Sequence, residues 1–257
     1  MKRRILTAAA LLIACLLTLT ACGKKELSLY NTACKNYNAA EGVKAEFTST
    51  FRLDEGGTAT DGVFAGNLEI AHKEGAVEAA HLTGTLTMTI SNGEAAPVPV
   101  EMYYANGRLY AVMSGSKYYT TATWEQARQL IGPVGELLTG YEETDFREIT
   151  LTEDGDSKKL SFTLNSAAAE KVPGITEEWR RIAAMGSAEE PQLTMNVLTG
   201  YIITNKKEAA SQNMSYAGTV SAGERTLIVQ NTIDSRFTYE AVEISVPDEA
   251  EYKEINK

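Results

Sequence analysis

Residues 98–113 read VPVEMYYANGRLYAVM, and this stretch decides the fold class of the chain. Apolar side chains recur at every second position from Val98 to Tyr104, which is the period of a strand with one buried face. Asn106-Gly107 follows, and this dipeptide favours a two-residue hairpin turn because both of its positions accept a positive φ. The sequence therefore predicts an antiparallel hairpin in which residues 98–104 pair with residues 108–113.

The same two-residue period recurs along most of the chain, separated by turns rich in Gly, Asn and Asp. The other predicted strands cover residues 43–52, 64–70, 82–90, 117–120, 146–151, 158–164, 193–197, 201–207, 213–220, 227–233 and 237–246. The last of these changes phase, which predicts a β-bulge near Ala241. A sheet of this size must curl, either into a closed barrel or into a half-barrel whose concave side is filled by helices.

Three helical segments interrupt the strands. Ser28 is the expected N-cap of a helix over residues 28–40. Thr123 and Gln126 form a capping box for the second helix, and Thr176 is the expected N-cap of the third. No linker divides the chain, so we expect one mainly β (α+β) domain, a curved antiparallel sheet forming an unclosed half-barrel with helices covering its concave face.

The N-terminus has the pattern of an export signal. A basic cluster at residues 2–4 precedes an uncharged run over residues 5–19, which is shorter than the ~20 residues of a spanning helix. Small residues then lead to Cys22, as in the signals of bacterial lipoproteins. This resemblance implies cleavage after Ala21 and diacylglycerol on the Cys22 sulfur, and two or three acyl chains anchor a protein stably. A short transmembrane anchor and an earlier box at Cys15 are the weaker alternatives.

These boundaries divide the chain into a signal peptide (residues 1–21), a lipidated tether (22–27) and a folded domain (28–257). Without its signal the chain keeps 21 basic and 34 acidic residues, a net charge of −13. This charge repels nucleic acid and anionic lipid headgroups, so we expect neither as a partner. Cys34 becomes the one free cysteine, so no disulfide within the mature chain is expected. A lone thiol on a helix favours a small buried residue over a nucleophile.

Catalytic and metal-binding patterns are weak in this sequence. His72 and His81 flank one predicted turn, and only Glu74 and Glu78 could complete a metal site with them. Phosphate-binding, dinucleotide-binding, zinc-protease and serine-hydrolase motifs are missing from the sequence. We therefore expect no enzyme activity, no cofactor and no bound metal.

Two stretches resemble the LolA-like superfamily of bacterial envelope proteins, especially its lipidated LppX/LprG-type members. One is the aromatic hairpin of residues 103–110 with Tyr118-Tyr119 after it, and the other is the closing run of residues 246–250 with its proline and acids. The resemblance implies an unclosed half-barrel whose concave face, lidded by helices, binds the acyl chains of lipids or lipoproteins. It brings no catalytic residues.

The leading hypothesis is thus a lipoprotein held on the extracytoplasmic face of the cell membrane, binding a lipid or acyl-chain ligand between sheet and helices. The residues expected to line the ligand cavity are Phe47, Phe51, Leu68, Ile70, Leu86, Met88, Met102, Tyr104, Leu160 and Phe162. The alternative is a module that binds another envelope protein. That alternative predicts a solid core without a cavity and an exposed aromatic patch around Tyr118.

Overall fold

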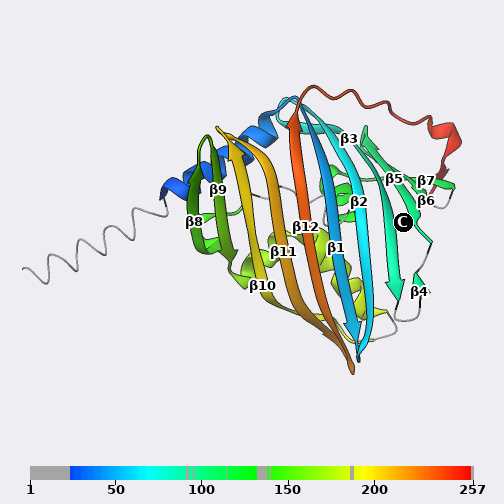
Figure 1. The fold of residues 1–257 in the computed structure, drawn as a ribbon. Coiled ribbons are helices and arrows are strands. Elements are labelled where there is room, and N and C mark those ends of the chain that lie inside the picture. The colour runs from blue at the N-terminus through cyan, green and yellow to red at the C-terminus, as the bar shows by residue number, and fades with distance from the viewer. Residues whose placement is uncertain are drawn as a thin grey trace, which may run out of the picture.

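The computed structural model describes residues 24–90, 93–94, 96–113, 115–131, 138, 140–185 and 188–255. These ranges form one 13-stranded sheet in the order β13-β7-β6-β5-β3-β2-β1-β12-β11-β10-β9-β8, with β4 paired to β3. The two ends of this order do not pair with each other, so the sheet is not closed (Figure 1). The predicted unclosed half-barrel is confirmed.

The strands are long and twisted, as a curled sheet requires. Their bounds are β1 Gly42–Glu55, β2 Thr58–Lys73, β3 Ala76–Ile90, β4 Gly93–Glu94, β5 Val98–Ala105, β6 Arg108–Met113, β7 Ser116–Thr121, β8 Phe146–Asp154, β9 Ser157–Leu164, β10 Gln192–Asn205, β11 Glu208–Ala222, β12 Arg225–Tyr239 and β13 Lys253–Glu254. All pairings are antiparallel except that of β13 with β7. The predicted hairpin of residues 98–113 is present as β5 and β6, with Asn106 and Gly107 both at positive φ.

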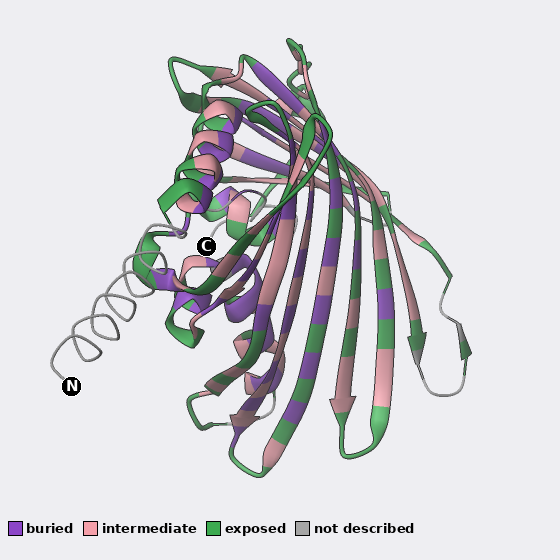
Figure 2. Cartoon of the chain, turned by 60° about the vertical axis from the view of Figure 1, so that its left-hand side comes forward, coloured by how far each residue is buried: buried purple, intermediate pink, exposed green. Residues whose placement is uncertain are grey.

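Alternating burial gives the sheet one inner and one outer face. In β1, Val43, Ala45 and Phe47 are buried, whereas Glu46 and Thr48 between and beyond them are exposed. Apolar side chains at every second position cover the concave face and polar ones face water, which is the pattern of a half-buried antiparallel sheet. Figure 2 shows this banding on the long strands and the helices on the concave side.

Helices cover part of the concave face. α3 (Pro173–Ala184) packs on β10, β11 and β12, while α2 (Trp124–Ile131) packs on α3 and β5. Short 3-10 turns follow at η2 (Glu143–Asp145) and η3 (Ser166–Lys171). The capping box before α2 is confirmed, since Thr123 Oγ1 accepts from the Gln126 backbone N–H at 3.3 Å and Gln126 Oε1 from that of Thr123 at 3.0 Å.

Two helix starts were predicted wrongly. The N-terminal helix spans residues 24–39, so it begins within the range expected as a tether and Ser28 lies inside it. The third helix begins at Pro173, and Thr176 is an interior, buried residue whose hydroxyl bonds the Val172 carbonyl at 3.4 Å. In both cases residues before the expected cap are also helical. In the third helix this is because Pro173 is favoured in a first helical turn. The N-terminal helix extends further because it packs on the sheet. Residues 132–137 lie outside the described ranges.

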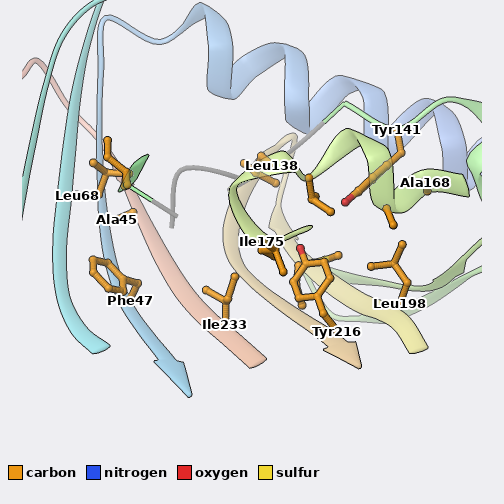
Figure 3. Close-up of a cluster of buried hydrophobic side chains, with 14 of the residues drawn as sticks. Ala45, Phe47, Leu68, Leu138, Tyr141, Ala168, Ile175, Leu198, Tyr216 and Ile233 are labelled. Carbon is orange, nitrogen blue, oxygen red and sulfur yellow. The ribbon is translucent and has the colours of Figure 1, made fainter. Parts of the chain in front are cut away.

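The core lies between the helices and the sheet (Figure 3). Tyr30 of the N-terminal helix is fully buried, and its ring meets those of Phe146 and Phe162 edge-on at 5.2 and 5.7 Å. Ile175 of α3 lies over Tyr216 of β11 in Figure 3, and both are buried. Aromatic edge-to-face packing adds to the free energy of area burial. This part of the half-barrel is therefore filled with side chains.

The chain after β12 leaves the sheet. β12 ends at Tyr239 and residues 240–248 form no strand, so the bulge predicted near Ala241 is wrong. The segment crosses to the far edge, where η4 (Glu249–Glu251) precedes β13 (Figure 1). Tyr252 packs edge-on to Tyr110 at 5.2 Å, and Arg108 binds Glu249. The change of phase in the sequence thus marks the point where the chain departs from β12 and covers the β7 edge.

Candidate ligand-binding site

Strand register places all ten residues of the predicted cavity on the concave face. Phe47 lies opposite Gly66, Phe51 opposite Gly62, and Leu68 opposite Leu82. Residues directly opposite each other in an antiparallel pair share a face, so each row of inward side chains can be followed from strand to strand between β9 and β6. The side chains that alternation assigned to the interior are therefore inside.

Burial divides the ten residues into two groups. Six are at most 8% exposed and belong to the filled core: Phe47, Leu68, Ile70, Tyr104, Leu160 and Phe162. The other four are only partly buried: Phe51, Leu86, Met88 and Met102. The structure thus places the first group beneath other side chains and leaves the second in partial contact with solvent.

The partly buried group extends to three neighbours that the sequence-based list omitted. Phe64 lies opposite Leu86, which lies opposite Val98, and Val100 follows on the same strand. We call this set the apolar floor: Phe51, Phe64, Leu86, Met88, Val98, Val100 and Met102. The alternating pattern of the sequence already indicates that Phe64, Val98 and Val100 point inward. If the strands had also been paired across their predicted turns, these three residues would have been placed next to the other four.

Glycines make room for two of the aromatic rings of the floor. An added Cβ at Gly62 would lie 2.0 Å from the Phe51 ring, and one at Gly84 would lie 2.5 Å from the Phe64 ring. Any side chain at these positions would displace the rings, so the sequence needs glycine at both. The Phe51 ring thus occupies the space beside Gly62 of β2, and the Phe64 ring the space beside Gly84 of β3.

Buried polar side chains border this floor on β1 and β12. Asn231 and Ser49 are each 3% exposed, and the Asn231 amide donates to Ser49 Oγ at 3.0 Å. Gln212 on β11 is equally buried and accepts from the Leu138 backbone N–H at 2.9 Å. Sequence reasoning missed these residues. The signal was present as polar residues at inward positions of apolar strands.

The convex face carries the other polar candidates. His81 stacks on Tyr103 at 4.1 Å, and both side chains bond Glu101, at 3.2 and 2.6 Å. The Tyr103 hydroxyl, more than the imidazole of His81, holds the pKa of Glu101 below its usual range. Among the described His, Cys, Asp and Glu side chains no group could hold a metal ion.

The predicted aromatic patch around Tyr118 is divided between the two faces. Tyr118 lies opposite Ala111, which lies opposite Met102, so it shares the concave side. Tyr110 and Tyr119 point to the convex side, where Tyr252 covers Tyr110 to 2% exposure. The tyrosines therefore do not form one exposed surface.

Cys22 and Cys34 are the two cysteines that would remain after the predicted cleavage. Cys22, the predicted lipidation site, lies outside the described residues. Cys34 is buried, and burial raises the pKa of its thiol to about 12. A thiol that stays protonated at neutral pH is a poor nucleophile, which fits the structural role expected for Cys34. Within the described ranges, no helix is long and apolar enough to cross a bilayer.

Comparisons with known proteins give structural matches only. No protein-family model matches the sequence, and a search of curated proteins gave no match. The chain is similar to LprF from Mycobacterium bovis, with 11% identity and a TM-score of 0.45 over 88% of this chain and 97% of that one. It is also similar to a DUF1329 family protein from Desulfovibrio piger (8% identity, TM-score 0.29, 87% and 95% covered). A beta-barrel-like DUF1849 protein from Brucella abortus matches with 8% identity and a TM-score of 0.23, over 77% and 99% of the two chains. These are likenesses of fold.

Proposed function

We propose that this protein is a non-catalytic lipoprotein, anchored by Cys22 to the extracytoplasmic face of a membrane, that binds a hydrophobic ligand on the apolar floor. The ligand would be a lipid or the acyl chains of a lipoprotein. One observation carries the proposal: the seven apolar side chains of the floor remain partly exposed on the concave face, whereas Phe47, Leu68, Ile70 and Tyr104 on the same strands are buried. Exposed apolar area of this kind commonly marks a binding surface.

The floor has a suitable size for an acyl chain. It runs over four inward positions along the strands, from Met88 to the level of Met102 opposite Leu82, and crosses β1, β2, β3 and β5. At ~3.4 Å per residue this is roughly 20 Å long. Each methylene that leaves water for such a surface contributes about 0.8 kcal/mol. A single chain lying along it would therefore bind with useful affinity.

The filled part of the half-barrel favours the second candidate, a module that binds another envelope protein. Six of the ten predicted cavity residues are packed in the core, and two surface depressions lie away from the floor. One depression follows the N-terminal helix beside Glu143, and the other lies on the convex side at Lys44 and Arg236. A partner protein would contact such outer surfaces and would leave the floor unoccupied.

A charge on the floor tests the first candidate. We expect Met88→Asp to weaken acyl-chain binding at least tenfold, because a carboxylate there must be desolvated by the ligand. Thr89→Asp is the matched control, since Thr89 is exposed on the opposite face of the same strand. Native mass spectrometry of delipidated protein incubated with a lipid extract measures the bound fraction. If the unaltered protein retains no lipid, the interaction module becomes the better hypothesis.

Anchoring is tested at Cys22 and at Cys15, which lies within the predicted signal peptide. We expect Cys22→Ser to release the protein from the membrane fraction and to remove the mass of the acyl groups, because the thioether cannot form without the sulfur. Cys15→Ser should leave both unchanged, since Cys15 would be removed with the signal. Fractionation with intact-mass measurement distinguishes the two. Retention of the Cys22→Ser protein would contradict lipid anchoring at this residue.

A further inference from the structure

Two buried polar atoms on the concave face of β12 lack partners among the described residues. Asn231 Oδ1 and Ser235 Oγ are buried without a hydrogen bond, on side chains that are 3% exposed. Turning the Asn231 amide over exchanges the atom that meets Ser49 Oγ, so one amide atom stays unpaired either way. Proteins rarely bury such groups unless something else satisfies them.

Strand register places this polar group at the border of the floor. Asn231 lies opposite Phe51, and Ser49 lies opposite Phe64, on the same concave face. Phe51 and Phe64 both belong to the floor, so the unpaired amide is next to the surface proposed for the acyl chain. A ligand with its chain on β2, β3 and β5 would bring its other end to β1 and β12.

The residues around Ser49 and Asn231 limit the charge that the polar end of the ligand can carry. The inward positions of residues 43–53, 60–70, 80–88, 98–104 and 227–237 hold no Lys, Arg, His, Asp or Glu. Below them Arg225 and Glu55 neutralise each other through two hydrogen bonds of 2.7 and 3.0 Å. An anionic headgroup would lose its hydration here without gaining a cation.

We propose that the Ser49–Asn231 pair is the polar anchor of the ligand site, and that the ligand is an uncharged amphiphile carrying an O–H or N–H donor. This inference rests on the proposed function and names its substrate class. The donor bonds Asn231 Oδ1 while the apolar chain covers the floor. Neutral acylglycerols and long-chain alcohols have this chemistry, whereas fatty-acid anions and anionic phospholipids do not.

Three probes of equal chain length test the anchor in protein lacking residues 1–22, all of which lie outside the described fold. These are 1-dodecanol, dodecyl methyl ether, which has no donor, and dodecanoate at pH 8. We expect the alcohol to bind about tenfold more tightly than the ether, with dodecanoate weaker than both. Titration calorimetry measures the three affinities.

Asn231→Leu should weaken the alcohol about tenfold, to the level of the ether, and leave ether binding unchanged. Gln230→Leu, an amide replaced on the exposed face of the same strand, is the matched control. Asn231→Ser keeps a polar group if the leucine variant fails to fold, and should retain part of the preference for the alcohol.

The outcomes separate the two proposals. If none of the probes binds the unaltered protein, the proposed function fails. Suppose instead that alcohol and ether bind equally to the unaltered and Asn231→Leu proteins. The floor then binds alkyl chains, an ordered water satisfies Asn231 Oδ1, and the proposed role of the Ser49–Asn231 pair as an anchor is wrong. Tightest binding of dodecanoate would overturn the assignment to an uncharged ligand.

Discussion

Replacing Tyr30 with alanine is expected to lower the free energy of unfolding by about 3 to 5 kcal/mol, the range for large aromatic side chains in cores. Tyr30 is 0% exposed and touches the rings of Phe146, Phe162 and Tyr141, which come from β8, β9 and the segment before β8. It therefore joins the N-terminal helix to the far end of the sheet. Its removal leaves a cavity that three aromatic rings cannot close.

Urea unfolding followed by tyrosine and tryptophan fluorescence measures this loss. Tyr201→Ala is the matched control, because Tyr201 is only partly buried and its ring contacts the exposed Lys159 at 4.0 Å. We expect that substitution to cost less than about 1 kcal/mol. If Tyr30→Ala lowered the free energy of unfolding as little as the control is expected to, the N-terminal helix would contribute little to the stability of the sheet.

Gly66→Ala is expected to destabilise the protein by about 3 kcal/mol, the upper range for overpacked sites. A Cβ at position 66 would lie 2.0 Å from the Thr83 carbonyl oxygen and 2.6 Å from Gly84 Cα. Both atoms belong to the backbone, so no change of rotamer relieves the contact. β2 and β3 would have to separate where Gly66 and Gly84 face each other.

Gly140→Ala is the control, since an added Cβ there has open space within 4 Å. Thermal unfolding of both variants, monitored by far-ultraviolet circular dichroism, gives the comparison. We expect the control to match the unaltered protein. A Gly66→Ala protein with unchanged stability would mean that the strands can shift at this pair without loss of packing.

Alternation and turn chemistry predicted the sheet well. The inward positions of the strands and the Asn106-Gly107 hairpin depend on local residues only, and both agree with the structure. Even the side of the sheet on which the ten candidate residues lie could be predicted. Period two is a property of the backbone, so it is visible wherever one face is buried.

Alternation could not predict which inward side chains of the concave face are buried and which remain partly exposed. Leu68 and Leu86 have the same side-chain type and occupy inward positions of neighbouring strands, yet only Leu68 is sealed. The difference depends on which part of the sheet the helices and neighbouring side chains cover, and that is decided by packing between segments far apart in the chain. The unpaired Asn231 amide escaped prediction for the same reason.

The centre of this sheet is made from the two ends of the sequence. Val43 pairs with Tyr239 across β1 and β12, and β13 closes the edge at β7. Pairings of such long range form slowly, since the loop between them must be ordered first. If the predicted signal directs export from the N-terminus, β1 would cross the membrane well before β12, and the two strands could not yet pair. Late pairing of β1 with β12 would keep the chain unfolded during translocation, and would delay folding until export is nearly complete.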